Sequence, residues 1–195
     1  MALKKVAFIC MFILGCILSV SQITAFAQEN SMSDEYLLLK AVKDKDYGKV
    51  RTQLQKGANV NTREFADGET PLYIAATLKD SITATFLLNE NASTDIPKIS
   101  TGETPLMVAV RLRAKEFVDL LILQKADVDI SDRTGETALY KAVKNNDRQM
   151  AQALLDANAD WSIADNTGRT PLDIAKENRR LRSMIRILEE AGAEY

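Results

Sequence analysis

The stretch Gly68-Glu69-Thr70-Pro71-Leu72 decides the fold of this chain, because it returns three more times at a nearly constant interval. The later copies are Gly102-Glu103-Thr104-Pro105-Leu106, Gly135-Glu136-Thr137-Ala138-Leu139 and Gly168-Arg169-Thr170-Pro171-Leu172. Their first glycines are 34, 33 and 33 residues apart. A period of this length is typical of a solenoid, in which each copy of one supersecondary unit covers the apolar face of its neighbour. Such an array exposes a long surface rather than a closed pocket, so binding is the activity to expect first.

Each copy has the pattern of two helices. In the first full copy, Thr70 is a candidate N-cap, and Pro71 suits the first helical position, where its missing N–H costs nothing. Leu72 and the pair Ala75-Ala76 lie on one face at helical spacing, and a second apolar run at 86–88 follows a polar break. The small alanines let the first helix lie close to its neighbours. The sequence therefore predicts an all-α fold of stacked helix-turn-helix units.

The motif Thr-Pro-Leu-x-x-Ala-Ala, complete at 70–76 and varied in the later copies, is followed by a Leu-Leu pair and a short polar tail, and a similar tail ends residues 34–61, where Thr-Pro is missing. The tails are Gly57-Ala58-Asn59-Val60-Asn61, Asn91-Ala92-Ser93-Thr94-Asp95, Lys125-Ala126-Asp127-Val128-Asp129 and Asn158-Ala159-Asp160-Trp161-Ser162. In motif and tail together the chain resembles the ankyrin repeat. The resemblance implies an ankyrin-repeat solenoid whose helical units are joined by β-turn fingers.

The repeats and a leader divide the chain into successive segments. These are a signal peptide (1–27), a short linker (28–33), an amino-terminal capping repeat (34–67), three internal repeats (68–101, 102–134 and 135–167) and a carboxy-terminal capping repeat (168–195). The linkers that form the first two fingers are each one residue longer than the last two, which leaves their turn shape open.

Two slots depart from the family pattern. The slot of the usual histidine after Thr-Pro-Leu holds Tyr73, Met107, Tyr140 and Asp173. The slot of the usual glycine between the two helices holds Lys79, Arg113, Asn146 and Arg179. We therefore expect the polar network between neighbouring loops to be weaker or differently built than in the family.

The first 27 residues have the three parts of a secretory signal peptide. Lys4 and Lys5 form a positive start, residues 6–20 are largely apolar, and Ala25-Phe26-Ala27 is a small-x-small cleavage site. The apolar stretch is short for a spanning helix, which needs about 20 residues, so cleavage is favoured over a membrane anchor. Cys16 lies in a loose lipoprotein box, and lipidation there is the minority alternative. We expect an exported, periplasmic protein, with secretion or lipid anchoring as alternatives.

Composition restricts the chemistry of the mature chain. Both cysteines, Cys10 and Cys16, lie in the leader, and the sequence contains no histidine. Loss of Lys4 and Lys5 changes the formal net charge from −2 to −4, and this mild acidity argues against nucleic acid as the main partner. No nucleophile–base pair, calcium loop or phosphate loop is recognisable. We therefore predict no enzymatic activity, no cofactor and no metal.

The resemblance implies a contact surface made of the finger tips and the exposed side of the first helices, which form the concave face of an ankyrin array. The predicted partner-binding residues are Phe65, Glu69, Tyr73, Leu78, Ile99, Glu103, Met107, Arg111, Arg133, Glu136, Tyr140 and Lys144. Glu69, Glu103 and Glu136 would form a ladder of acids for a basic partner. The alternative is that each is simply a favoured residue near a helix N-terminus.

Aromatic and methionine side chains are enriched at interface centres, so Tyr73, Met107 and Tyr140 are expected on the exposed strip, with burial between fingers as the alternative. Trp161 is expected to be structural. The function we predict is a monomeric, exported, non-catalytic module that binds another protein. A lipid-anchored envelope scaffold and a secreted effector acting on a host protein remain alternatives.

Overall fold

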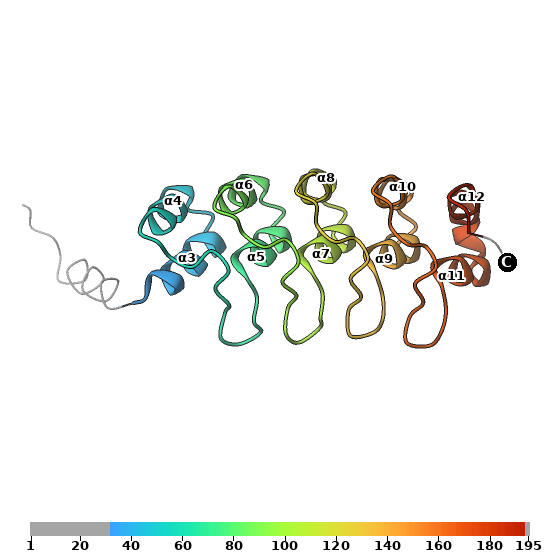
Figure 1. Ribbon diagram of the computed structural model, residues 1–195, viewed down its shortest axis with the longest axis horizontal. Coiled ribbons are helices and arrows are strands. Elements are labelled where there is room, and N and C mark those ends of the chain that lie inside the picture. Colours follow the sequence, from blue (N-terminus) through green and yellow to red (C-terminus); the bar gives the residue numbers. More distant parts are fainter. Residues whose placement is uncertain (1–31, 194–195) are drawn as a thin grey trace, which may run out of the picture. The chain divides into compact units, whose positions relative to one another are not determined.

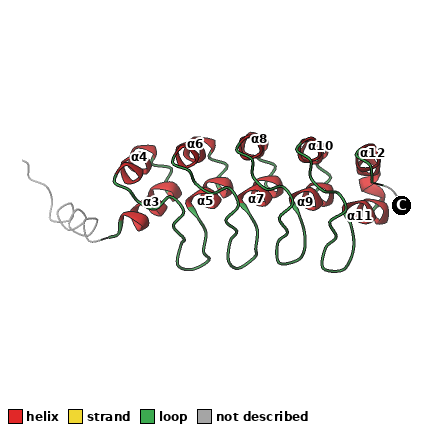
Figure 2. Ribbon diagram, viewed as in Figure 1, coloured by secondary structure: helices red, strands yellow, loops and turns green. Residues whose placement is uncertain are grey.

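The computed structural model describes residues 32–193, and within Asp34–Tyr195, one compact unit, the described part is a row of helix pairs (Figure 1). The helices are α3 (Asp34–Lys43), α4 (Tyr47–Gln55), α5 (Pro71–Thr77), α6 (Ser81–Asn89), α7 (Pro105–Arg111), α8 (Lys115–Leu123), α9 (Ala138–Lys144), α10 (Arg148–Asp156), α11 (Pro171–Glu177), the 3₁₀ helix η1 (Arg179–Leu181) and α12 (Arg182–Glu190). Residues 32–193 contain no strand, and Figure 2 shows only helices and loops there. The predicted all-α repeat solenoid is confirmed.

The helix pairs are arranged in layers. The first helices of the pairs form one row, the second helices form another, and the loops between pairs project as fingers on one side (Figure 1). The predicted signal peptide lies outside the described residues. None of the helices between residues 32 and 193 combines the length and apolar character needed to cross a bilayer.

Threonine starts the first helix of four pairs, as the sequence predicts for Thr70. The Thr70 hydroxyl accepts a hydrogen bond from the Tyr73 N–H at 3.2 Å. Thr104, Thr137 and Thr170 cap their helices in the same way. The second helices have their own caps, which the sequence analysis missed: Asp46, Asp80 and Asp147 each accept an N–H from three residues further on. At the same position before α8, Ala114 provides no side-chain cap.

The core runs along the whole row, between the first and second helices. Leu72, Leu106 and Leu139 repeat the same buried slot, and Ala75 and its equivalents are fully enclosed. Because Ala75 has only a methyl group, it leaves room for close contact between helices. The array is therefore held by packing between like units rather than by one central core.

Polar side chains join the tail of each repeat to the next. The Asn61 Oδ1 accepts the Ser93 N–H at 2.8 Å. Asp95 accepts the Asp127 N–H at 3.0 Å, and Asp129 accepts the Asp160 N–H at 2.7 Å, so the bond recurs once per repeat.

Asn91, which follows α6, has a φ of 60°, as expected for a left-handed turn that ends a helix.

The turn between paired helices is left-handed although it lacks the usual glycine. Lys79, Arg113 and Asn146 have φ values of 53°, 55° and 54°, a conformation that costs a side-chain-bearing residue about 1 kcal/mol. In one such turn the Arg113 guanidinium donates to the Asn145 carbonyl of the next repeat at 2.7 Å. Arg179 departs from the pattern, because the last connection has one more residue and forms η1.

Candidate functional site

The fingers come in two sizes, as the lengths of the linkers between repeats predict. In the first finger the Glu64 N–H bonds to the Glu69 carbonyl at 2.8 Å, and the Gly68 N–H bonds back to Glu64. In the third finger the Asp132 N–H bonds to the Glu136 carbonyl at 3.1 Å. The second finger follows the first, and the fourth follows the third. The extra residue of the longer fingers is therefore accommodated inside the turn, at the tip.

A carboxylate organises each shorter finger. The Asp132 Oδ1 accepts the N–H groups of Thr134 at 2.8 Å and Glu136 at 3.1 Å. Asp165 makes the matching bonds in the last finger, and its bond to the Thr167 hydroxyl, followed by its bond to Tyr140, holds its pKa well below the ordinary range. The first two fingers have no aspartate at this slot.

The longer fingers carry the apolar tips. Phe65 is fully exposed and Ile99 is 55 % exposed. Ile99 lies directly over Gly68, because a Cβ built on that glycine would meet the Ile99 Cδ1 at 2.3 Å. The Arg63 guanidinium bridges the two fingers, donating to the carbonyls of Gly68 at 3.1 Å and Pro97 at 2.9 Å. The apolar tips are therefore presented on neighbouring loops that are bonded to each other.

Backbone bonds between tips continue along the row. The Ile99 N–H donates to the Asp67 carbonyl at 3.1 Å, and the Arg133 N–H donates to the Thr101 carbonyl at 3.0 Å. The Asn166 N–H completes the series on the next finger. All four fingers thus form one connected strip whose tips change from apolar at Phe65 and Ile99 to polar at Arg133 and Asn166.

The structure corrects the expectation that Tyr73, Met107 and Tyr140 lie on the exposed strip. They are 3 %, 1 % and 1 % exposed, so they belong to the core. Their helix position faces the next repeat, where the Tyr73 hydroxyl lies 3.4 Å from Glu103 and the Tyr140 hydroxyl donates to Asp165. Burial, followed by the charge of Glu103, raises the pKa of Tyr73 to about 12. Burial and Asp165 likewise raise the pKa of Tyr140.

The structure also corrects the expectation that Glu69, Glu103 and Glu136 form a ladder of acids that are free to meet a basic partner. The Lys98 ammonium lies 2.8 Å from Glu69. Glu103 is 8 % exposed, and both of its oxygens accept from the Arg111 guanidinium, at 3.1 and 3.3 Å. Glu136 bonds to the exposed Lys144 at 2.6 Å. Because each glutamate already has a cation of this chain, the ladder is a set of internal contacts.

A buried lysine at the centre of this network was missed by the sequence analysis. The Lys141 Nζ lies 2.6 Å from Asp132, 3.2 Å from Glu136 and 3.6 Å from Glu103. Burial opposes the charged form of Lys141, but the bonds to Asp132 and Glu136 prevail and raise its pKa. Burial also opposes the Asp132 carboxylate, yet the bonds from Lys141 and Thr134 lower its pKa.

A signal for this lysine was present in the sequence. The same slot of the first helix holds Ile74, Val108 and Ile174 in other repeats, so a lysine among these apolar residues indicates a buried charge with partners. Leu78, another of the predicted contact residues, directly follows α5 and is partly buried against the core. Of the predicted surface, the exposed residues are Phe65, Ile99, Arg111, Arg133 and Lys144.

Two further expectations concern Trp161 and metal binding. Trp161 is partly buried and packs against the core. In the part of the chain that the structure describes, no cluster of three or more His, Cys, Asp or Glu residues is placed to hold a metal ion. The acids near the fingers are engaged by Lys98, Arg111 and Lys141. Chemically, the finger strip offers apolar tips and exposed cations for contact with another molecule.

The stacked helix pairs and the bonded fingers define a repeat solenoid. The chain matches the family described as ankyrin repeats (3 copies) over residues 38–132 and again over residues 114–195. These matches cover well over half of the chain, so the protein belongs to the ankyrin-repeat family. A comparison with curated proteins gave no match. Ankyrin repeats are generally protein–protein interaction modules, and the family is typically non-catalytic.

Proposed function

We propose that this protein is a non-catalytic module that binds a partner protein through its finger surface, with Phe65 and Ile99 as the apolar anchors. The observation that carries the proposal is that the two longer fingers, which lie side by side, are the two with exposed apolar tips. Burial of one exposed phenylalanine side chain is worth about 1.5–3 kcal/mol. A micromolar dissociation constant corresponds to a binding free energy of about 8 kcal/mol, and two such anchors on adjacent fingers can supply a large share of it.

The rigidity of the fingers supports this role. The Ile99 N–H and the Arg63 guanidinium already bond the second finger to the first, so little freedom remains to be lost on binding. Exposed Arg111 and Lys144 lie further along the first helices, and Arg133 occupies the next finger tip. These cations would form a polar rim beside the apolar anchors, the usual composition of a protein interface.

The test compares two kinds of exposed apolar residue. Phe65→Ser with Ile99→Ser removes both anchors, whereas Leu123→Ser changes a side chain that is 74 % exposed at the end of α8 and away from the fingers. A photo-crosslinking residue placed at 65, and at 123 in a matched variant, is used in intact cells. The proposal is supported if a partner protein crosslinks to position 65 and not to position 123. The crosslink at position 65 should also disappear when Ile99→Ser is added. Equal capture at both positions contradicts it.

We further propose that the protein is exported and released as the chain that begins at Gln28. The support is the Lys4-Lys5 start, the apolar stretch 6–20 and the Ala25-Phe26-Ala27 site. In this proposal it acts in the periplasm as a monomer on another exported protein, without cofactor or nucleic acid. Mass spectrometry of the mature amino terminus tests it. A mass that begins at Gln28 supports release, and an acylated Cys16 would establish an anchored protein instead.

A further inference from the structure

Arginine is concentrated at the carboxy-terminal end of the array, away from the finger surface. We propose that the groove between α10 and α12 binds an acidic, extended segment of a protein partner, as a second contact surface on the second-helix side. The arginine groove is lined by Arg148, Gln149, Gln152, Ser183, Arg186, Ile187 and Glu190. This proposal does not depend on the finger surface, because no residue is common to the two.

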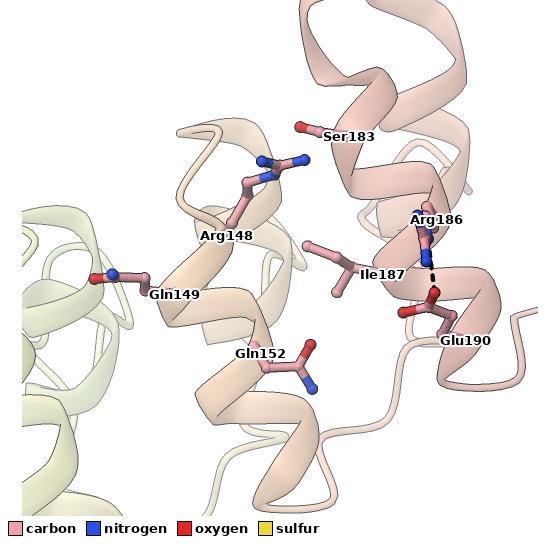
Figure 3. A pocket seen from close by; sticks show the side chains of 7 residues that line it. All are labelled: Arg148, Gln149, Gln152, Ser183, Arg186, Ile187 and Glu190. Carbon is pink, nitrogen blue, oxygen red and sulfur yellow. Dashed lines mark hydrogen bonds and ion pairs between the residues drawn. The ribbon is translucent and has the colours of Figure 1, made fainter.

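The groove has a charged wall on each side and an apolar floor. Its volume is about 390 Å³. Arg148 from α10 and Ser183 from α12 point toward one another at one end, and Ile187 projects between the helices (Figure 3). At the other end Arg186 bonds to Glu190 at 2.7 Å. An extended chain could therefore place an acidic side chain between Arg148 and Ser183 and rest its backbone over Ile187.

Further arginines adjoin the entrance beside Ser183. Arg179 and Arg180 belong to η1, and Arg182 is the first residue of α12, so Arg182 directly precedes Ser183 and the other two lie three and four residues before it. Each is exposed. Within residues 32–193, neither these three nor Arg148 forms an ion pair with a carboxylate of the chain. The only acid that lines the groove is Glu190, which already pairs with Arg186, so Arg148 is available to a carboxylate of the partner.

The longer connection before α12 holds these arginines in place. Asn178 caps η1 by accepting the Arg180 N–H at 3.0 Å, and Leu181 is buried beneath the turn. The backbone that carries these arginines is therefore hydrogen-bonded to Asn178 and anchored to the core by Leu181. Arginine presents a planar fork whose two N–H groups can form parallel bonds to the two oxygens of a carboxylate, whereas lysine presents a compact point charge. The Arg186–Glu190 pair lies on the surface, where such pairs contribute little, so an incoming carboxylate can replace Glu190.

The chemistry of the groove favours an acidic peptide over other anionic partners. No aromatic side chain lines it, so it lacks the stacking platform that single-stranded nucleic acid requires. A second groove of similar volume lies between α4 and α6, but there the Arg51 guanidinium already stacks on Phe86 at 5.8 Å. That groove provides an internal control.

The binding experiment uses a fluorescent peptide of about ten residues with alternating Glu and Ser, and measures fluorescence anisotropy with the full mature chain. The Arg148→Glu, Arg182→Glu variant is expected to weaken binding at least about 30-fold at low salt, because two cation–carboxylate contacts become repulsions. The control variant, Arg51→Glu with Lys79→Glu, changes the net charge by the same amount and should weaken peptide binding less than about 3-fold. Phe65→Ser with Ile99→Ser should leave peptide binding unchanged.

Three outcomes would overturn the proposal. Equal weakening in the arginine-groove and control variants would show a response to net charge alone. Failure of the unaltered chain to bind the peptide at low salt would remove the site. Binding to vesicles that contain phosphatidylserine, without binding to the peptide, would identify a lipid surface as the ligand. Far-UV circular dichroism of each variant confirms that a loss of binding is not a loss of folding.

Discussion

Lys141→Ile is the most informative single change in the array, because it tests whether the acids beside the fingers are structural. The Lys141 ammonium is the cation shared by Asp132, Glu136 and Glu103. After the change, Arg111 still holds Glu103 and Lys144 still holds Glu136. Asp132 is therefore the carboxylate that loses its cation, in a buried position.

The size of the effect follows from these contacts. A buried carboxylate left without its partner costs about 3–5 kcal/mol. Isoleucine offsets about 1 kcal/mol by burying apolar surface, since Ile74 and Ile174 occupy the equivalent slot in other repeats. We expect the free energy of unfolding to fall by about 3 kcal/mol at pH 7. Adding Asp132→Asn removes the unpaired charge and should recover about 2 kcal/mol of this loss.

Urea unfolding followed by far-UV circular dichroism measures both variants at pH 7 and at pH about 4.5. In the native chain the pKa of Asp132 is lowered, so its contribution is present above its ordinary value of 3.8 and is lost as the pH falls. In Lys141→Ile the Asp132 carboxylate keeps its bonds from Thr134 and Glu136 but loses its cation, so its pKa rises from the native value and acid relieves part of the penalty. The difference between native chain and variant should therefore shrink at the lower pH. A loss below about 1 kcal/mol at pH 7, or one that does not depend on pH, would refute this account.

Two further outcomes can be checked on the same protein. Gly135→Ala and Gly168→Ala both force alanine to a φ above 80°, but a Cβ at Gly135 would also lie 2.6 Å from the Asn166 backbone nitrogen, whereas Gly168 has open space. Thermal unfolding should show Gly135→Ala to be less stable than Gly168→Ala by at least about 1 kcal/mol, and equal midpoints would contradict the finger contact. The free energy of unfolding should also decline below about pH 4, because the folded-state pKa of Asp165 is lowered and that stability is lost as the carboxylate is protonated. Asp165→Asn should make the decline shallower, as acid titration of the two chains would reveal.

The sequence predicted the features that local chemistry determines. Thr70 and Pro71 mark the start of a helix by themselves, and the extra residue in the first fingers can be counted. The direction of Tyr73 could not be read in this way, because its burial depends on Glu103 in the following repeat. The slot is buried at Tyr73, Met107 and Tyr140, where another unit follows, and the motif of one unit does not show that the next unit covers it.

The same limit applies to the charged residues. Glu103 is an ordinary helix-start acid in sequence, and its role appears only when Arg111 and Lys141 are placed around it. Phe65 and Ile99 were identified correctly as exposed tips, because a finger tip has no neighbouring unit to cover it. The sequence shows the arginines at 179, 180, 182 and 186, but the groove itself depends on the spacing of α10 and α12 and could not be predicted.

The contact between Glu103 and Lys141 also limits how the array can be rebuilt. An additional unit inserted between the third and fourth pairs would separate these two side chains, which lie 3.6 Å apart, and leave the buried Glu103 with Arg111 as its one cation. Duplication at that junction would therefore produce a weak seam, however well the new module matched the consensus. Lengthening between α4 and α5 separates no comparable interior charge pair, so an engineer who wishes to extend this scaffold should begin there.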